Sequence, residues 1–293
     1  MKAAYSTGVC SSVGIGASRG GRTVNEDNYL IYADGVATLR AGDGQRQEGI
    51  PGDGLMVAVA DGMGGHAAGD VASEAAVRAL THLLMRASSP EDPEAALRGF
   101  VAAAHARLYD QAQAQKAGNM GTTLTVAWIL DGIVSWVNVG DSRVYLQRGD
   151  RLQQLSCDQT RAELARRDGR PPPREPDALA QAFIFGSRGL GDDRALRLDE
   201  GKDTGSVRLQ VGDRLLLCSD GVHGWLSTSG IDDALRAPGD LSQVAAGLVE
   251  RAMRVGSDDN LTAVLVQVDA LDTGEPEGGL PLDDIRTLVP DEG

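Results

Sequence analysis

Acidic residues stand beside glycine, asparagine or a second acid at four separate places in this 293-residue chain. These places are Glu26-Asp27, Asp61-Gly62, Asp220-Gly221 and Asp258-Asp259-Asn260. Hard divalent cations such as Mg2+ and Mn2+ bind carboxylate and carbonyl oxygens, with water in the remaining positions. The pattern therefore favours a metal site, although a single Asp-Gly pair is also a common turn.

The two middle pairs come directly after apolar segments. Residues 55–60 lead into Asp61, and residues 215–219 lead into Asp220. A buried strand that ends in a carboxylate and a turn residue delivers that carboxylate to one edge of a core. We therefore expect Asp61 and Asp220 to converge in space.

Six motifs follow one another along the chain. They are Arg22-Thr23-Val24-Asn25-Glu26-Asp27, Asp61-Gly62-Met63-Gly64-Gly65-His66, Gly121-Thr122-Thr123, Gly140-Asp141-Ser142-Arg143, Ser219-Asp220-Gly221 and Asp259-Asn260. In these motifs, over about residues 12 to 268, the chain resembles the bacterial form of the metal-dependent protein serine/threonine phosphatases, the PPM or type 2C family. The resemblance implies an α+β fold, a four-layer sandwich in which two central antiparallel β-sheets are flanked by α-helices.

The resemblance also implies an activity and a ligand set. Phosphoserine and phosphothreonine in proteins would be hydrolysed by a water or hydroxide that bridges two Mn2+ or Mg2+ ions. Asp61 would bridge the ions, the backbone carbonyl of Gly62 would ligate one of them, and Asp27 would accept hydrogen bonds from metal-bound water. The implied metal residues are Glu26, Asp27, Asp61, Gly62, Asp220 and Asp259.

Two further site residues follow from the resemblance. Arg22 matches the arginine that clamps the substrate phosphate, because a guanidinium group can hold two phosphate oxygens at once. Asp141 matches a residue that relatives use, together with Asp220, for a weaker third metal. Some of those relatives carry an acid where this chain has Gly224, so the third site is weak, altered or absent, and Asp141 could instead shape its turn.

None of the four histidines is assigned to catalysis. His66 is interpreted as a loop residue, with acid catalysis as the alternative. His223 is interpreted as supporting its loop, with contact at the metal periphery as the alternative. His82 and His105 fall in expected helices and are interpreted as ordinary helix residues.

Composition excludes several functions. The net charge of −14 argues against binding to nucleic acid or to anionic membranes. The three cysteines have no C-x-x-C spacing, which indicates a reducing compartment without disulfides or a zinc site. No signal peptide and no apolar run of the ~18 residues needed to span a bilayer is recognised. We expect a cytoplasmic protein whose partners are phosphorylated proteins and, by resemblance, a bacterial Ser/Thr kinase.

Motifs at both ends favour one phosphatase domain, residues 1–269, followed by an acidic and disordered tail, residues 270–293. Apolar spacing predicts helices over 70–87 and from Pro90 to about Lys116. Residues 156–200 are expected to form a less regular surface excursion near the site. The other expected elements are two short strands over 8–33, a hairpin over 34–54, a meander of strands at 122–130, 133–139, 143–147 and 152–155, strands at 214–218 and 261–268, and a helix at 241–254.

Two other functions stay open from the sequence. A non-catalytic phosphoprotein-binding regulator could keep the fold, although Asp61, Asp220 and Asp259 are all present. A phosphohydrolase acting on nucleotides or sugars would need a pocket with base-stacking aromatic residues, and aromatic residues make up only 4% of this chain.

Overall fold

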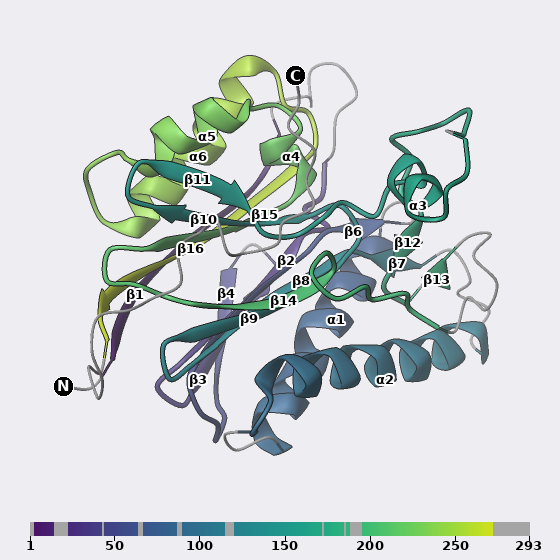
Figure 1. Ribbon diagram of the computed structural model, residues 1–293, viewed down its shortest axis with the longest axis horizontal. Helices are drawn as coiled ribbons and strands as arrows, with labels where there is room; N and C mark the ends of the chain where they lie inside the picture. Colours follow the sequence, from purple (N-terminus) through teal and green to yellow (C-terminus); the bar gives the residue numbers. More distant parts are fainter. Residues whose placement is uncertain are drawn as a thin grey trace.

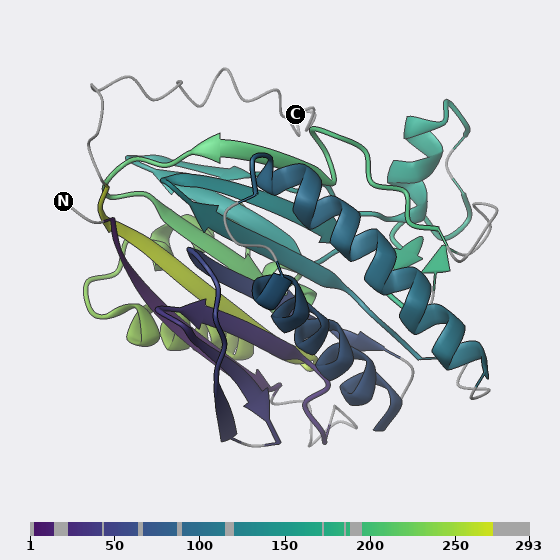
Figure 2. The same ribbon diagram turned by 90° about the horizontal axis from the view of Figure 1, so that it is seen from below.

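The structure, a computed structural model, shows two sheets that face each other between two pairs of helices (Figure 1). It describes residues 3–14, 23–42, 44–63, 67–86, 90–114, 120–171, 173–184, 186–187 and 195–271. In Figure 1, α1 and α2 lie below the sheets, and α5 and α6 lie above them. Figure 2 views the molecule from the side of α1 and α2.

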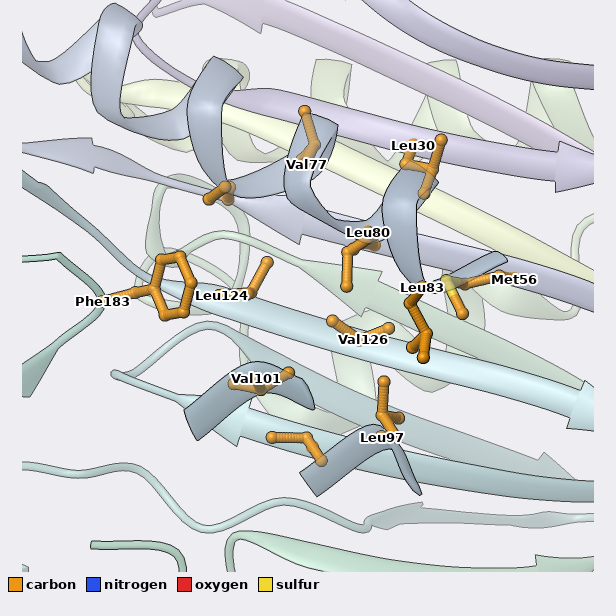
Figure 3. Close-up of a cluster of buried hydrophobic side chains, with 14 of the residues drawn as sticks. Leu30, Met56, Val77, Leu80, Leu83, Leu97, Val101, Leu124, Val126 and Phe183 are labelled. Atoms are coloured by element: carbon orange, nitrogen blue, oxygen red, sulfur yellow. The ribbon is translucent and has the colours of Figure 1, made fainter. Parts of the chain in front are cut away.

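The larger sheet has seven antiparallel strands, in the order β14-β9-β8-β5-β2-β3-β4. Helices α1 (Ala67–Arg86) and α2 (Pro93–Ala114) cover its outer face, where Leu80 and Val101 are buried with Met56 and Val126 (Figure 3). The strands are β14 (Thr204–Arg208), β9 (Ile133–Val139), β8 (Leu124–Leu130), β5 (Leu55–Ala60), β2 (Asn28–Ala33), β3 (Val36–Ala41) and β4 (Gly44–Gly49).

The smaller sheet has five antiparallel strands and is covered by α5 (Thr228–Leu235) and α6 (Leu241–Val255). Helix α6 begins after Asp240, whose side chain accepts the backbone N–H of Gln243, and ends at Gly256 with φ of +111°. In sheet order the strands are β1 (Ala4–Val13), β16 (Asn260–Ala270), β15 (Arg214–Cys218), β10 (Arg143–Arg148) and β11 (Arg151–Gln154).

Three buried clusters hold the layers together, one between the sheets and one under each helix pair. Between the sheets, Val57 and Val59 of β5 pack with Leu217 of β15 and Val264 of β16. Alternate residues of each strand point to opposite faces, so both sheets bury apolar side chains on both sides. The four-layer α+β sandwich expected from the resemblance is confirmed.

The predicted meander over residues 122–155 is wrong in one respect. Strands β8 and β9 pair in the larger sheet, whereas β10 and β11 belong to the smaller one. The chain crosses between the sheets at Gly140–Ser142, where Gly140 has φ of +105°. Residues 122–130 are also not one strand, because the pairing breaks at Thr123 between β7 (Gly121–Thr122) and β8.

Residues 156–200 contain more regular structure than predicted. They include α3 (Arg161–Arg167), β12 (Gln181–Ala182) and β13 (Gly186–Ser187). The fully buried Asp203 receives Nη1 of Arg167 at 2.7 Å, which ties α3 to the chain just before β14. Elements this short show too little periodicity to be predicted from sequence, and α4 (Asp220–His223) and α5 were missed for the same reason.

None of the helices that the structure describes has the length and apolar character of a membrane span. Residues 272–293, most of the expected tail, lie outside the described residues. The division into a domain and a tail therefore stays a prediction.

Candidate active site

Asp61 lies where β5 gives way to β6 (Gly62–Met63), and its backbone is fixed by the opposite strand. The Asp61 N–H donates to Oγ1 of Thr123 at 2.9 Å. The Asp61 carbonyl accepts the Thr123 N–H at 2.9 Å and the Thr122 hydroxyl at 2.8 Å. The interruption at Thr123, between β7 and β8, therefore fixes the backbone of Asp61 at one edge of the larger sheet.

The carboxyl of Asp61 lies among other negative charges. Burial raises its pKa well above the ordinary value, and the charges of neighbouring carboxylates raise it further. The four neighbours, in decreasing order of effect, are Asp27, Asp220, Asp141 and Asp259. The structure thus brings together residues that the sequence separates by as many as 232 positions, from Asp27 to Asp259.

Asp27 is fully buried, and so it is not a solvent-facing residue at a strand end. Burial raises the pKa of Asp27 to about 7, although hydrogen bonds from Thr262 and Ser219 act in the opposite direction and lower it. The Ser219 hydroxyl donates to Oδ2 at 2.8 Å. Within the part of the chain that the structure describes, Oδ1 of Asp27 is buried and has no hydrogen-bond partner.

Asp220 is the first residue of α4, and close backbone packing sets this helix against β16. A Cβ added at Gly221 would come within 1.9 Å of the Asn260 carbonyl oxygen, so only glycine permits this approach. Oγ of Ser219 accepts the Thr262 N–H at 3.0 Å. Ser219 therefore joins Asp27, the start of α4 and β16.

Asn260 ties the segment around Glu26 to β16. Its Oδ1 accepts the Glu26 N–H at 2.9 Å, and its Nδ2 donates to the Val24 carbonyl at 3.0 Å. Glu26 is buried, with its carboxylate beside Gly69, where a Cβ would come within 2.8 Å of Oε2. A Cβ at Gly62 would meet the Gly69 carbonyl oxygen at 2.3 Å, so α1 packs directly on the Asp61-Gly62 turn.

Asp141 lies on the crossing between the sheets and is held there by α4. Burial raises its pKa to about 7, and the charges of Asp220 and Asp158 contribute. Burial also lowers the pKa of His223 to about 4, so its ring is neutral at pH 7. Nε2 of His223 lies 2.9 Å from the Asp141 carbonyl oxygen, and because a carbonyl only accepts, the ring nitrogen donates.

The segment Asp158-Gln159-Thr160 supports the same crossing. Asp158 accepts three hydrogen bonds from Arg143, from Nη2 to Oδ2 at 2.7 Å and from Nε to Oδ1 at 2.9 Å and to Oδ2 at 3.1 Å. The buried Gln159 accepts the Gly140 N–H at 2.8 Å through Oε1. Glutamine thus provides the acceptor that fixes the Gly140 turn.

Several expected residues lie outside the described residues. These are Arg22, Gly64, Gly65 and His66. Among the residues that are described, no group of three or more His, Cys, Asp or Glu side chains is arranged as a ready-made ion site. We therefore define the acidic cluster as Asp61 together with Asp27, Asp141, Asp220 and Asp259, the carboxylates whose charges raise its pKa.

Sequence reasoning missed the residues that support this cluster. Ser219 stood in a quoted motif, but only its aspartate was assigned a role, and Thr262 showed no local signal. His105 lies in α2 as predicted, and the structure adds that it is fully buried and that its Nδ1 accepts the Ile184 N–H at 3.0 Å.

Comparison with known proteins decides the family. The family model described as protein phosphatase 2C matches residues 46–266, about three quarters of the chain. The chain belongs to the protein phosphatase 2C family. This family membership agrees with the resemblance seen in the six motifs.

Bacterial serine/threonine phosphatases are among the relatives of this protein phosphatase 2C chain. It is 34% identical over 245 residues to the serine/threonine protein phosphatase PstP of Mycobacterium tuberculosis, an alignment that covers 80% of this chain and 45% of PstP. The chain thus spans less than half the length of that relative. It is also 34% identical over 230 residues to the serine/threonine phosphatase Stp of Listeria monocytogenes, covering 75% of this chain and 86% of Stp.

Solved structures show the same protein phosphatase 2C fold. The catalytic domain of PstP, solved in complex with two manganese ions, matches with a TM-score of 0.69 and 30% identity over 92% of this chain and all of that one. Staphylococcus aureus Stp1 matches with a TM-score of 0.71 and 23% identity over 92% and 97% of the two chains, which supports the fold alone.

Proposed function

We propose that this protein removes phosphate from phosphoserine and phosphothreonine in proteins, using two divalent cations held by the acidic cluster. The observation that carries the proposal is the placement of the fully buried Asp27 and the partly exposed Asp61 among further carboxylates that raise their pKa values. Buried carboxylates must be matched by positive charge or by protons. A related phosphatase contains two manganese ions, which supports bound cations, rather than protons, as the source of this positive charge.

The residues present suit Mn2+ or Mg2+. All the side chains in the cluster are carboxylates, which are ligands of hard cations. Oδ1 of Asp27 is buried and can accept a hydrogen bond from water around an ion, while Ser219 already occupies Oδ2. When bound, the ions would lower the pKa of the attacking water and offset charge on the phosphoryl oxygens.

Each residue has a distinct proposed role. Asp61 would be shared between the two ions, Asp220 and Asp259 would hold one of them, and Glu26 and the Gly62 carbonyl would support the other. Asp27 accepts hydrogen bonds from water and orients it, because its own position is fixed by Ser219. Arg22 would clamp the substrate phosphate, and Asp141 would contribute to a third, weaker ion. The proposed site residues are Arg22, Glu26, Asp27, Asp61, Gly62, Asp141, Asp220 and Asp259.

The substrates are phosphorylated proteins, and a Ser/Thr kinase is the natural counterpart. The net charge of −14 opposes long-range attraction of a phosphate group. Attraction therefore has to arise locally, from bound cations and Arg22. Measuring turnover with Mn2+ and with Mg2+ separately decides which of the two ions the protein uses.

Release of phosphate from a phosphothreonine peptide tests this function. We expect turnover with Mn2+, none with EDTA, and a loss of at least about a hundredfold in kcat for Asp61→Asn, because that change removes the shared carboxylate. Asp150→Asn is the matched control, since Asp150 is an exposed turn residue outside the cluster.

The outcomes separate the candidate functions. Turnover that survives EDTA or Asp61→Asn would contradict the metal mechanism. Binding of the phosphopeptide without turnover would instead favour a phosphoprotein-binding regulator.

A further inference from the structure

We propose that His105 is a positioning residue for the active site. It holds Phe183 and Ile184 against Thr122, and Thr122 in turn fixes the backbone of Asp61. The inference rests on the proposed function only in that Asp61 is taken as the residue that acts on phosphate. The contacts themselves join two segments that the active-site motifs do not account for, α2 and residues 183–184, to Thr122.

His105 is completely buried in the middle of α2. Its ring stacks on Tyr109 with a centroid distance of 6.0 Å and meets the Phe183 ring at 5.7 Å with a tilt of 58°. Its Nδ1 accepts the backbone N–H of Ile184 at 3.0 Å. A neutral ring that accepts through Nδ1 carries its hydrogen on Nε2, so the contact also fixes the tautomer.

The backbone that His105 binds is in an unfavourable conformation. Ile184 has φ of +73°, in the left-handed region that β-branched residues rarely adopt. Such a residue keeps this conformation only where surrounding contacts require it. Ile184 is buried, and the acceptor for its N–H is His105, so the hydrogen bond is one of those contacts.

Phe183 passes this constraint on to the active site. It pairs with Thr122 through two backbone hydrogen bonds, Phe183 N–H to Thr122 O at 2.7 Å and Thr122 N–H to Phe183 O at 3.1 Å. The Thr122 hydroxyl donates to the Asp61 carbonyl at 2.8 Å. From Nδ1 of His105 to Asp61, the path consists of three hydrogen bonds joined by the peptide unit between Phe183 and Ile184 and by Thr122 itself.

The Phe183 side chain adds a packing constraint. It is buried in the cluster under α1 and α2, beside Leu124 in Figure 3. The hydrogen bond from Ile184 and the packing of Phe183 therefore act on adjacent residues. Two variants separate these effects.

His105→Phe keeps an aromatic ring for Tyr109 and Phe183 but removes the acceptor, so the Ile184 N–H would be buried without a partner. His105→Asn keeps an acceptor close to the position of Nδ1 but removes the ring. His82→Asn is the matched control, because His82 is an exposed histidine on α1.

Hydrogen–deuterium exchange of the full chain measures local opening at these contacts and does not depend on enzyme activity. We expect His105→Phe to speed exchange of the Ile184 and Thr123 amides about tenfold, because an unmatched buried donor favours local opening. Thr123 reports on Asp61, since its N–H donates to the Asp61 carbonyl. His105→Asn should exchange like the wild type at both amides.

Kinetics with the phosphothreonine peptide provide the second readout. We expect His105→Phe to lower kcat about tenfold with little change in KM, because a displaced catalytic group slows the reaction more than it weakens binding, and His105→Asn to restore kcat.

Unchanged exchange at Ile184 or Thr123 in His105→Phe would overturn the proposal, as would equal disturbance in His105→Asn. A wild type that releases no phosphate would refute the proposed function, while the exchange comparison would still judge the role of His105.

Discussion

A buried carboxylate needs specific partners, and Asp27 shows how this chain provides them. One oxygen of Asp27 accepts the Ser219 hydroxyl, and the other has no hydrogen-bond partner in the described part of the chain. Desolvation raises the pKa of Asp27 to about 7, so the metal-free site favours partial protonation near neutral pH. A bound cation would offset the unfavourable desolvation of the ionised Asp27 carboxylate by supplying positive charge beside it.

Ser219→Ala tests this arrangement. The change removes the donor to Asp27 and the acceptor for the Thr262 N–H, so we expect about 1–3 kcal/mol lower stability. Mn2+ affinity should fall by about 10- to 100-fold, because the group that orients Asp27 is lost. Isothermal titration with Mn2+ and urea denaturation measure the two effects, with the exposed Ser229→Ala as control. Wild-type Mn2+ affinity in Ser219→Ala would show that Asp27 needs no such orientation.

At the scale of elements, glycines decide how closely helices approach the strands that carry the acids. Gly221 lets the first turn of α4 rest on the Asn260 carbonyl, and Gly62 lets the Asp61 turn rest on α1. These close approaches place Asp220 and Asp61 at the same edge of the sandwich. The glycines of the Asp-Gly pairs therefore contribute packing as well as turn conformation.

Gly221→Ala and Gly247→Ala should have opposite effects on stability. Alanine at Gly221 would place Cβ 1.9 Å from the Asn260 carbonyl oxygen, so we expect a loss of about 1–3 kcal/mol. Gly247 lies within α6 with nothing within 4 Å of its added Cβ, so alanine should stabilise by about 0.5–1 kcal/mol. Urea denaturation of both variants is the measurement. A stable Gly221→Ala protein would mean that α4 can move away from β16.

For the whole molecule, the sandwich gathers negative charge from distant segments at one edge. Burial and mutual repulsion raise the pKa values of Asp27, Asp61 and Asp141 together. The folded metal-free protein therefore binds protons that the unfolded chain would release. Its stability should depend on pH through these groups and on divalent cations.

Asp141→Asn isolates one part of this dependence. The pKa of Asp141 is about 7 in the fold and 3.8 in a free chain, so its contribution to stability is present below pH 3.8 and is lost as pH rises through 7. Asparagine does not ionise. We therefore expect the free energy of unfolding of Asp141→Asn, relative to wild type, to increase from about pH 5 to about pH 8 in EDTA. Urea denaturation across this range is the test, and a difference that does not change with pH would contradict the raised pKa.

Local patterns in the sequence predicted much of this protein. Apolar runs indicated β5 and β15, and helical spacing indicated α1, α2 and α6, because burial against a neighbouring layer imposes a period on the chain. The acidic pairs and their order identified the family, which the match over residues 46–266 confirmed. The roles of the individual acids stay predictions.

Only the tertiary structure decided how these pieces meet. The crossing at Gly140–Ser142 was invisible in sequence, because consecutive strands look alike whether they join one sheet or two. Ser219 reaches Asp27 across 192 positions, and His105 reaches Ile184 across 79. Such contacts depend on how layers pack rather than on any local period, so the residues that support the site appear only once the chain is folded.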